Sequence, residues 1–292
     1  MRNLQLLNKM RELFAKGYTP TQVAAEVKIN QKNIHYYINK YNIKVINKCR
    51  THFINDEYFD SINTEEKAYL LGFFIADGNL AIKGKRLAIT TVEKDKNVLE
   101  AYSRNIIPEF IITTVNRSTD TIKRQNQCLV RWGSEHMFNT LVNKYNIIPN
   151  KTKYTTFKFP FETIPPDLVR HFIRGFFDGD GCVSYFNRSS TRKNLFFNFS
   201  FVMNSLEFTN QIADIFEELF DVKRVIYTHK GKTCDYYSLR FDYSNHRQEA
   251  IKYIYNWLYK DSTLFLQRKK DKFNNYINTE LRSKITKGLD TV

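Results

Sequence analysis

The stretch YLLGFFIADG, residues 69–78, returns in altered form as HFIRGFFDGDG, residues 171–181. Each copy is an apolar run that ends in Asp-Gly. Thr64 is placed to cap a helix through the first copy, and Glu65 and Glu66 lie in its opening turn, where the helix dipole favours acids. We therefore expect two apolar helices, each ending at an aspartate, around which the rest of the chain is arranged.

Each copy also carries two small residues four positions apart, namely Gly72 with Ala76 and Gly175 with Gly179. Small residues on one helix face allow two helix backbones to approach closely, so we expect the two helices to pack on each other. Asp77 and Asp180 would then lie side by side at the C-terminal ends, where the dipole and the neighbouring acid both oppose their charge. Divalent cations would relieve that repulsion, and Mg²⁺ suits phosphodiester hydrolysis because it prefers oxygen ligands.

Residues 70–78 and 173–181 resemble the LAGLIDADG signature, and the chain is similar to the LAGLIDADG homing endonucleases of the monomeric, two-motif type. One departure is Ile75, where the motif often has an earlier acid that the second copy keeps as Asp178. In the family the metal is held by the aspartate before the final glycine, which both copies retain. The alternative is a packing motif whose acids do not bind metal.

The resemblance implies an enzyme that uses Mg²⁺ to make a double-strand break with short 3′ overhangs in a long asymmetric DNA target. It makes Asp77 and Asp180 the catalytic metal ligands, with any backbone ligand near Ala76 unassigned. It also places a catalytic basic residue after the last helix of each half, for which Lys151 and Lys269 are the candidates. We expect a monomer that needs no protein partner, because the duplication supplies both halves of a dimer-like interface.

The composition agrees with a nucleic-acid partner. The 292 residues include 45 Lys and Arg against 30 Asp and Glu, a net charge of +15, which favours a polyanion. No signal-peptide pattern or run of about eighteen apolar residues occurs, so we expect an intracellular protein, cytoplasmic or in an organellar matrix, without a membrane partner. The cysteines form no CxxC pair and indicate neither a zinc site nor a disulfide framework: Cys49, Cys128, Cys182 and Cys234.

The hydrophobic pattern predicts an α+β fold with a duplicated element order. In residues 61–160 and again in 161–292 a helix is followed by two strands, a helix, two strands and a helix. We expect two pseudo-symmetric αββαββα halves, the second with a basic C-terminal tail, whose four hairpins form one DNA-binding saddle. A strand ribbon fits the major groove of B-DNA.

Basic and amide side chains of the hairpins are the candidate DNA contacts of the saddle, without a distinction between base readers and phosphate anchors. They are Arg86, Arg117, Lys123, Arg124, Gln125, Arg188, Arg192, Lys193, Asn198, Lys230, Lys232 and Arg240.

Residues 1–45 are expected to form a separate all-α domain, joined by a basic linker, 46–60. Three helices are indicated by apolar periodicity, and residues 11–41 resemble the helix-turn-helix of resolvases and transposases, whose second motif helix enters the major groove. The outward residues of that helix, and so the candidate contacts, are Gln31, Lys32, His35 and Tyr36. The alternative is a three-helix packing unit without DNA contacts.

Together these features predict a site-specific homing endonuclease. Two alternatives stay open: a non-cleaving DNA-binding regulator on the same fold, and an intron RNA maturase that uses the same basic surface. Both motif acids are present, which argues against the regulator. The target sequence, the number of metal ions and the host element, whether intron, intein or free-standing gene, do not follow from the sequence.

Overall fold

The computed structural model of the protein describes residues 2–16, 18, 20–43, 45, 53–108, 112–116, 118, 125–149, 155–187, 195–243 and 247–289. The chain forms two compact units, Met1–Phe53 and Ile54–Val292. Each unit has its own apolar core and is described separately.

The first unit contains three helices, α1 (Arg2–Ala15), α2 (Pro20–Glu26) and α3 (Gln31–Lys40). They enclose a small core in which Met10, Phe14, Val23 and Ile34 are fully buried. The side chain of Asn30 caps α3 by accepting a hydrogen bond of 2.9 Å from the backbone N–H of Lys32. The helices lie where apolar periodicity predicted them.

The second unit begins with the first predicted half. Its elements are α4 (Glu65–Asp77), β1 (Gly78–Ala81), β2 (Arg86–Val92), the 3₁₀ turn η1 (Glu93–Asp95), α5 (Lys96–Ile106), β3 (Thr113–Val115), β4 (Gln127–Gly133) and α6 (Glu135–Asn143). The four strands form an antiparallel sheet in the order β1-β2-β4-β3. Thr64 caps α4 by accepting from the N–H of Lys67, as the sequence predicted.

The other half repeats this order and extends it by one helix. After the short turns η3 (Phe161–Thr163) and η4 (Pro166–Leu168), its elements are α7 (Val169–Asp180), β5 (Gly181–Asn187), β6 (Leu195–Met203), α8 (Leu206–Phe220), β7 (Lys223–His229), β8 (Tyr236–Asp242), α9 (Arg247–Tyr259) and α10 (Gln267–Leu289). Its sheet has the order β5-β6-β8-β7, the same as in the first half. The predicted α+β fold with two equivalent halves is confirmed.

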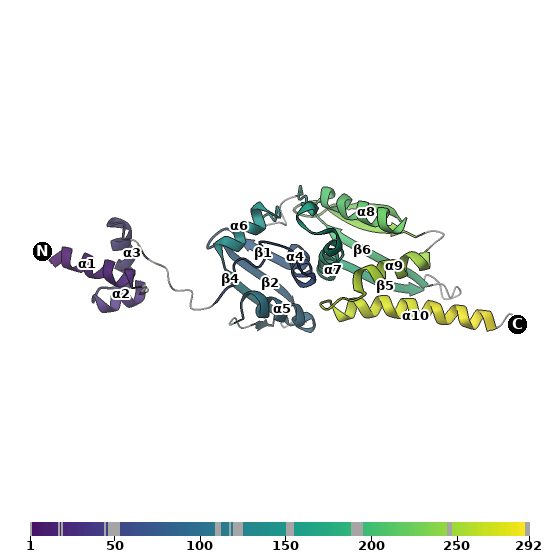
Figure 1. Ribbon diagram of the computed structural model, residues 1–292, viewed down its shortest axis with the longest axis horizontal. Coiled ribbons are helices and arrows are strands. Elements are labelled where there is room, and N and C mark those ends of the chain that lie inside the picture. Colours follow the sequence, from purple (N-terminus) through teal and green to yellow (C-terminus); the bar gives the residue numbers. More distant parts are fainter. Residues whose placement is uncertain are drawn as a thin grey trace. The chain divides into compact units, whose positions relative to one another are not determined.

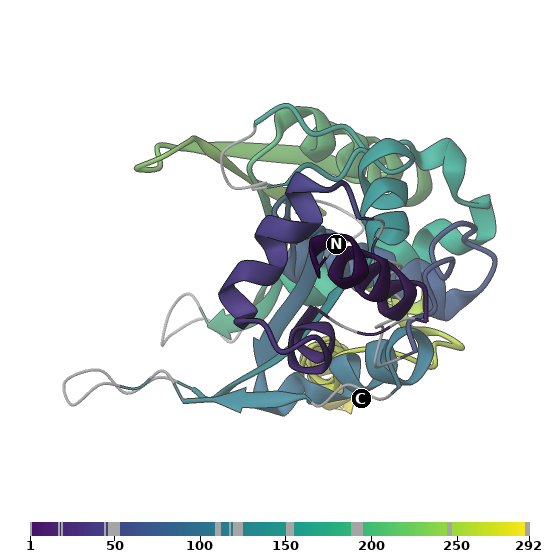
Figure 2. The same cartoon turned by 90° about the vertical axis from the view of Figure 1, so that its left-hand side faces the viewer.

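Both sheets turn one face to helices. In β2 the buried residues Leu87 and Ile89 alternate with the more exposed Arg86 and Ala88, so the pleat separates a core face from an outer face. In β6 three buried phenylalanines define the core face in the same way: Phe197, Phe199 and Phe201. In Figure 1 helices α4 and α7 lie between the two sheets, and in Figure 2 the β7–β8 hairpin and the β3–β4 pair extend toward the same side of the unit.

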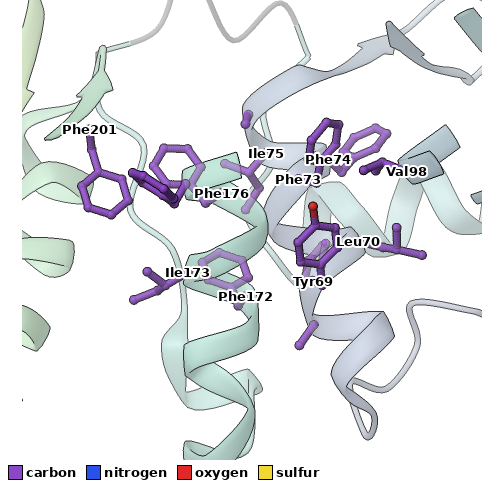
Figure 3. Packing of buried hydrophobic residues seen from close by; sticks show 14 of the residues in the cluster. Tyr69, Leu70, Phe73, Phe74, Ile75, Val98, Phe172, Ile173, Phe176 and Phe201 are labelled. Atoms are coloured by element: carbon purple, nitrogen blue, oxygen red, sulfur yellow. The ribbon is translucent and has the colours of Figure 1, made fainter. Parts of the chain in front are cut away.

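The two motif helices pack directly on each other, as Figure 3 shows. A Cβ atom added at Gly72 of α4 would lie 2.0 Å from the backbone oxygen of Phe172, and one added at Gly175 of α7 would lie 2.0 Å from that of Tyr69. These reciprocal contacts leave no room for a side chain at either glycine. The close approach predicted from the small-residue spacing is therefore confirmed.

Candidate active site

The helix pair brings the two predicted metal ligands to the seam between the halves. Asp77 and Asp180 are the last residues of α4 and α7. A Cβ atom at Gly179, the residue before Asp180, would lie 2.2 Å from the Cβ of Ala76 and 3.5 Å from Oδ2 of Asp77. Asp77 is half-buried and Asp180 is exposed. The helix ends thus place two carboxylates near each other at the accessible end of the seam.

The donor set fits a hard divalent cation. Asp77 and Asp180 supply carboxylate oxygens, and no cluster of three or more His, Cys, Asp or Glu side chains suited to a metal ion occurs among the described residues. Mg²⁺ is commonly held by one or two carboxylates, with water and substrate phosphate completing its octahedron. Two acids at an accessible seam match that requirement, whereas zinc sites need three or four protein ligands.

Lys269 lies close to the two acids, at the C-terminal end of α7. Its side chain is buried, 3% exposed, and its Nζ donates to the backbone oxygens of Phe177 at 2.5 Å and Gly181 at 2.7 Å, with that of Gly179 at 3.5 Å. Burial lowers its pKa to about 8, against the opposing effect of the acids Asp178, Asp180 and Asp77. The resemblance proposed Lys269 as the catalytic basic residue of the second half. The fold turns its ammonium group toward the C-terminal end of α7.

Arg268, the neighbour of Lys269 in sequence, has its partner in the first half and not at the end of α7. Arg268 pairs with the nearly buried Asp95 of the first half, Nη2 to Oδ2 at 2.9 Å. Lys151, the candidate in the first half, lies outside the described residues.

Asp178, the acid without a counterpart in the first motif, is fully buried. Its carboxylate accepts hydrogen bonds from the backbone N–H of Leu266 at 2.7 Å, the hydroxyl of Tyr69 at 2.8 Å and the hydroxyl of Tyr259 at 3.2 Å. Burial raises the pKa of Asp178, while the charge of Lys269 and the hydrogen bonds from Leu266 and Tyr69 oppose the rise. Sequence reasoning noted Asp178 as a motif feature and assigned it no partner.

A buried arginine forms a second junction between the halves. Arg174 of α7 is 0% exposed, and its guanidinium donates to Oε1 of Glu65 on α4 at 2.7 Å and to the backbone oxygens of Leu258 and Leu264 at 2.9 and 3.0 Å. Glu65 also accepts from the N–H of Thr263 at 2.7 Å. Glu65 was expected only as a dipole partner of its own helix, so its pairing with α7 went unforeseen.

The sequence of the second half matches a known family model. Residues 167–255 match the family model described as LAGLIDADG-like domain, and α7, the sheet and most of α9 fall within them. The second half contains a LAGLIDADG-like domain.

No helix of the described residues is long and apolar enough to cross a membrane.

Other comparisons cover further parts of the chain. Residues 9–47 match a family described as the putative ATPase subunit of terminase (gpP-like), and no curated protein matches the sequence. Among solved structures, the chain is similar to the LAGLIDADG homing endonuclease I-SmaMI bound to cleaved DNA, with 13% identity over 79% of this chain and 93% of that chain and a TM-score of 0.48. It is also similar to I-LtrWI bound to target DNA, with 13% identity over 78% of this chain and 92% of that chain and a TM-score of 0.44. A third similar structure is I-DmoI in complex with DNA and Ca, with 16% identity over 66% of this chain and 90% of that chain and a TM-score of 0.39.

Some candidate contacts of the LAGLIDADG-like domain lie on the outer face of its sheet. Arg240 is exposed on β8, and Asn198 is half-buried on β6. At the hairpin turn Lys232 is exposed, whereas Lys230 forms an ion pair of 2.6 Å with Asp235. Arg188, Arg192 and Lys193 lie outside the described residues.

In the first half, Arg86 on β2 and Gln125 before β4 are exposed. Arg117, Lys123 and Arg124 lie outside the described residues. In the N-terminal unit Lys32, His35 and Tyr36 are exposed on α3, and the side chain of Gln31 lies outside the description.

One arginine on an outer face was not among the candidate DNA contacts, although strand alternation places it on that face. Arg131 of β4 is exposed and pairs in register with Ala88, which pairs with Asn79. The equivalent row of the other sheet is Cys182, Ser200 and Arg240. Arg131 and Arg240 therefore occupy equivalent positions, in the first outward row after each motif.

Proposed function

We propose that this protein is a site-specific DNA endonuclease that makes a metal-dependent double-strand break in a long asymmetric target. The observation that carries the proposal is the meeting of Asp77 and Asp180 at the packed ends of two duplicated helices. The LAGLIDADG-like domain in residues 167–255 and the net charge of +15 support a nuclease acting on a polyanion.

In this proposal Asp77 and Asp180 hold Mg²⁺ ions. The bound metal supplies Lewis acidity at the phosphate and stabilises the attacking and leaving oxygens. The chain's own part is to place two carboxylates at one point. The buried positive charge of Lys269 lies close to both acids and to the negative end of the α7 dipole, so it offsets part of the repulsion between the carboxylates. Lys151 remains the proposed catalytic basic residue of the first half.

The proposed DNA contacts are the exposed side chains on the outer faces of the two sheets. Arg86 and Arg131 would serve the first half of the target and Arg240 the second, as guanidinium groups that match phosphate or guanine geometry. The halves differ in sequence, so the target has no need to be palindromic. The N-terminal unit would add contacts through Lys32, His35 and Tyr36 of α3.

The test is cleavage of a randomised DNA library by the purified protein with Mg²⁺, followed by rate measurements on the selected target. We expect a double-strand break that EDTA abolishes. Asp77→Asn and Asp180→Asn should each lower the cleavage rate roughly 10³-fold or more, because a metal contributes several kcal/mol to charge stabilisation and each tenfold in rate corresponds to about 1.4 kcal/mol.

Binding is measured in parallel by footprinting in EDTA, where both variants should protect the target as the wild type does. Asp221→Asn, which removes an exposed acid at the end of α8, is the matched control and should cut normally. Cleavage that resists EDTA, or full activity in either seam variant, would refute the metal-dependent mechanism. Footprints that do not extend beyond the sheet contacts would refute the role given to α3.

A further inference from the structure

We infer that Asp178 is a positioning residue, which docks the start of α10 on the motif helix so that Lys269 can cap that helix and hold the backbone around Asp180. The cleavage part of this inference rests on the proposed function, while its structural part does not.

The first step is the direction of the two acids on α7. Residues two apart on a helix point to nearly opposite sides, at about 200° from each other. Asp178 is accordingly buried and Asp180 exposed. A carboxylate with 0% exposure needs partners for its lone pairs, and three donors reach it from three different elements.

The second step is what these donors connect. Tyr69 belongs to α4 of the other half, Tyr259 ends α9, and Leu266 directly precedes α10. One carboxylate therefore ties the start of α10 to both motif helices. The bond to the N–H of Leu266, at 2.7 Å, is the one that fixes the chain three residues before Lys269.

The third step leads from Leu266 to Asp180. Leu266 and Lys269 are joined by a turn, since the N–H of Lys269 donates to the oxygen of Leu266 at 3.0 Å. The ammonium of Lys269 then donates to carbonyls on both sides of Asp180, those of Phe177 and Gly181. The oxygen of Phe177 also accepts the N–H of Gly181, so the cation joins that bond at the negative end of the helix dipole. The backbone that carries Asp180 is thus fixed by Lys269.

The connection between α9 and α10 is held at a second point by charge. Arg174 binds the oxygens of Leu258 and Leu264, and its partner Glu65 binds the N–H of Thr263. This support lies upstream of Leu266. In the first turn of α10 Arg268 pairs with Asp95, and Asp178 holds the N–H of Leu266 on the motif-helix side. At the equivalent position the first motif has Ile75, whose side chain cannot accept a hydrogen bond. Docking through a carboxylate at this motif position is therefore confined to the second half.

The experiment compares Asp178→Ile, which copies Ile75, with Asp178→Asn, which keeps an acceptor for Leu266, and with Lys269→Met. Hydrogen exchange of the Leu266 and Gly181 amides is read without DNA, and cleavage rate and DNA affinity are read separately. We expect Asp178→Ile to speed exchange at both amides at least tenfold and to slow cleavage at least tenfold, with affinity changed less than twofold. Asp178→Asn should recover most of both losses.

Lys269→Met should speed exchange at Gly181 while Leu266 stays protected. The Asp178→Ile, Lys269→Met double variant should cut no more slowly than the slower single variant, because the two residues act in series. If the two losses multiply, or if Gly181 stays protected in Asp178→Ile, the inference is wrong.

Tyr102→Phe is the matched control, since it removes another buried tyrosine hydroxyl bonded to a motif-helix backbone, that of Leu70 on α4. It should leave both amides and the cleavage rate unchanged. If Asp178→Ile does not fold, Tyr259→Phe removes one of the three donors and should give a smaller effect in the same direction at Leu266. An unchanged Leu266 amide in that variant would also overturn the inference. Wild-type protein that cuts no DNA would refute the proposed function, and the exchange measurements would still decide the docking role.

Discussion

At the scale of single residues, the second motif helix depends on groups that are charged or neutral because of their surroundings. His171 is 4% exposed at the start of α7, with its Nδ1 2.6 Å from Nη1 of Arg174. Burial, and next the positive charge of Arg174, lower the pKa of His171 to about 4. The ring is therefore neutral at pH 7, and a proton would place a second cation beside the guanidinium.

This predicts an acid-labile contribution to stability. The folded pKa of His171 lies below its ordinary value of 6.5, so the unfolded chain binds more protons than the folded chain between these two values. The free energy of unfolding therefore decreases as the pH is lowered through this range. The contribution is complete above about pH 6.5 and is lost progressively toward pH 4. Its size is about 1 to 3 kcal/mol, the lower figure allowing for solvent screening.

Urea unfolding at pH 7 and pH 4.5 checks this prediction, and His171→Gln should lose less free energy of unfolding over that interval than the wild type. His136→Gln is the control, because the contribution of His136 to the free energy of unfolding has the opposite pH dependence. A hydrogen bond to Asp60 raises the pKa of the exposed His136, so its contribution is present at low pH and lost as pH rises. An equal acid sensitivity in wild type and His171→Gln would contradict the assignment.

At the scale of elements, the contact of α4 with α7 depends on backbone packing against backbone. A methyl group at Gly72 has no flexible neighbour to displace, because its closest atoms are the oxygen and carbon of Phe172 and the nitrogen of Phe176. The helices would have to separate, which would also move Asp77 away from Asp180.

Gly72→Ala is therefore expected to lower the melting temperature by about 5 °C or more. Alanine gains about 1 kcal/mol in helix propensity, and overpacking against rigid backbone costs up to about 3 kcal/mol or more, so the net change is destabilising by roughly 2 kcal/mol. Gly133→Ala is the control, since the nearest atom to its added Cβ is 3.7 Å away. Equal melting temperatures for the two variants would show that α4 and α7 accommodate the added methyl group without loss of stability, which would contradict the prediction.

At the scale of the whole second unit, the duplication gives each sheet one arginine in the same row. Arg131 and Arg240 are equivalent by strand register and not by sequence, because the chain segments around them differ. Arg240 lies over the ring of Tyr227, 5.3 Å from its centroid, which orders its guanidinium. Equivalent positions in two halves should contact equivalent positions on either side of the cleavage site.

We predict that Arg131→Ala and Arg240→Ala each weaken protection of one half of the target and leave the other half protected. Loss of an arginine contact costs about 1 to 3 kcal/mol, so total affinity should fall roughly tenfold. Footprinting in EDTA measures this. Lys252→Ala, which removes an exposed charge from α9, should change neither half. Two arginine variants with the same uniform loss across the target would contradict the pseudo-symmetric arrangement.

The local sequence determined the parts of this protein that follow from short-range regularity. Strand alternation, helix periodicity and the Asp-Gly stops gave the element order of both halves, because side-chain direction repeats with a fixed period in each kind of element. The spacing of Gly72 with Ala76, and of Gly175 with Gly179, was sufficient to predict the helix contact and hence the meeting of Asp77 with Asp180.

Tertiary structure alone decided which residues, distant in sequence, become the hydrogen-bond and ion-pair partners of the buried charged side chains. The partners of Asp178 lie 109, 81 and 88 residues away in sequence, and Arg174 reaches Glu65 over 109 residues. No periodicity encodes such pairs, since each depends on where a loop returns to the core. The same holds for Lys269, which the sequence proposed as a catalytic basic residue but whose ammonium the fold directs to the negative end of α7, where it joins the N–H of Gly181 on the oxygen of Phe177.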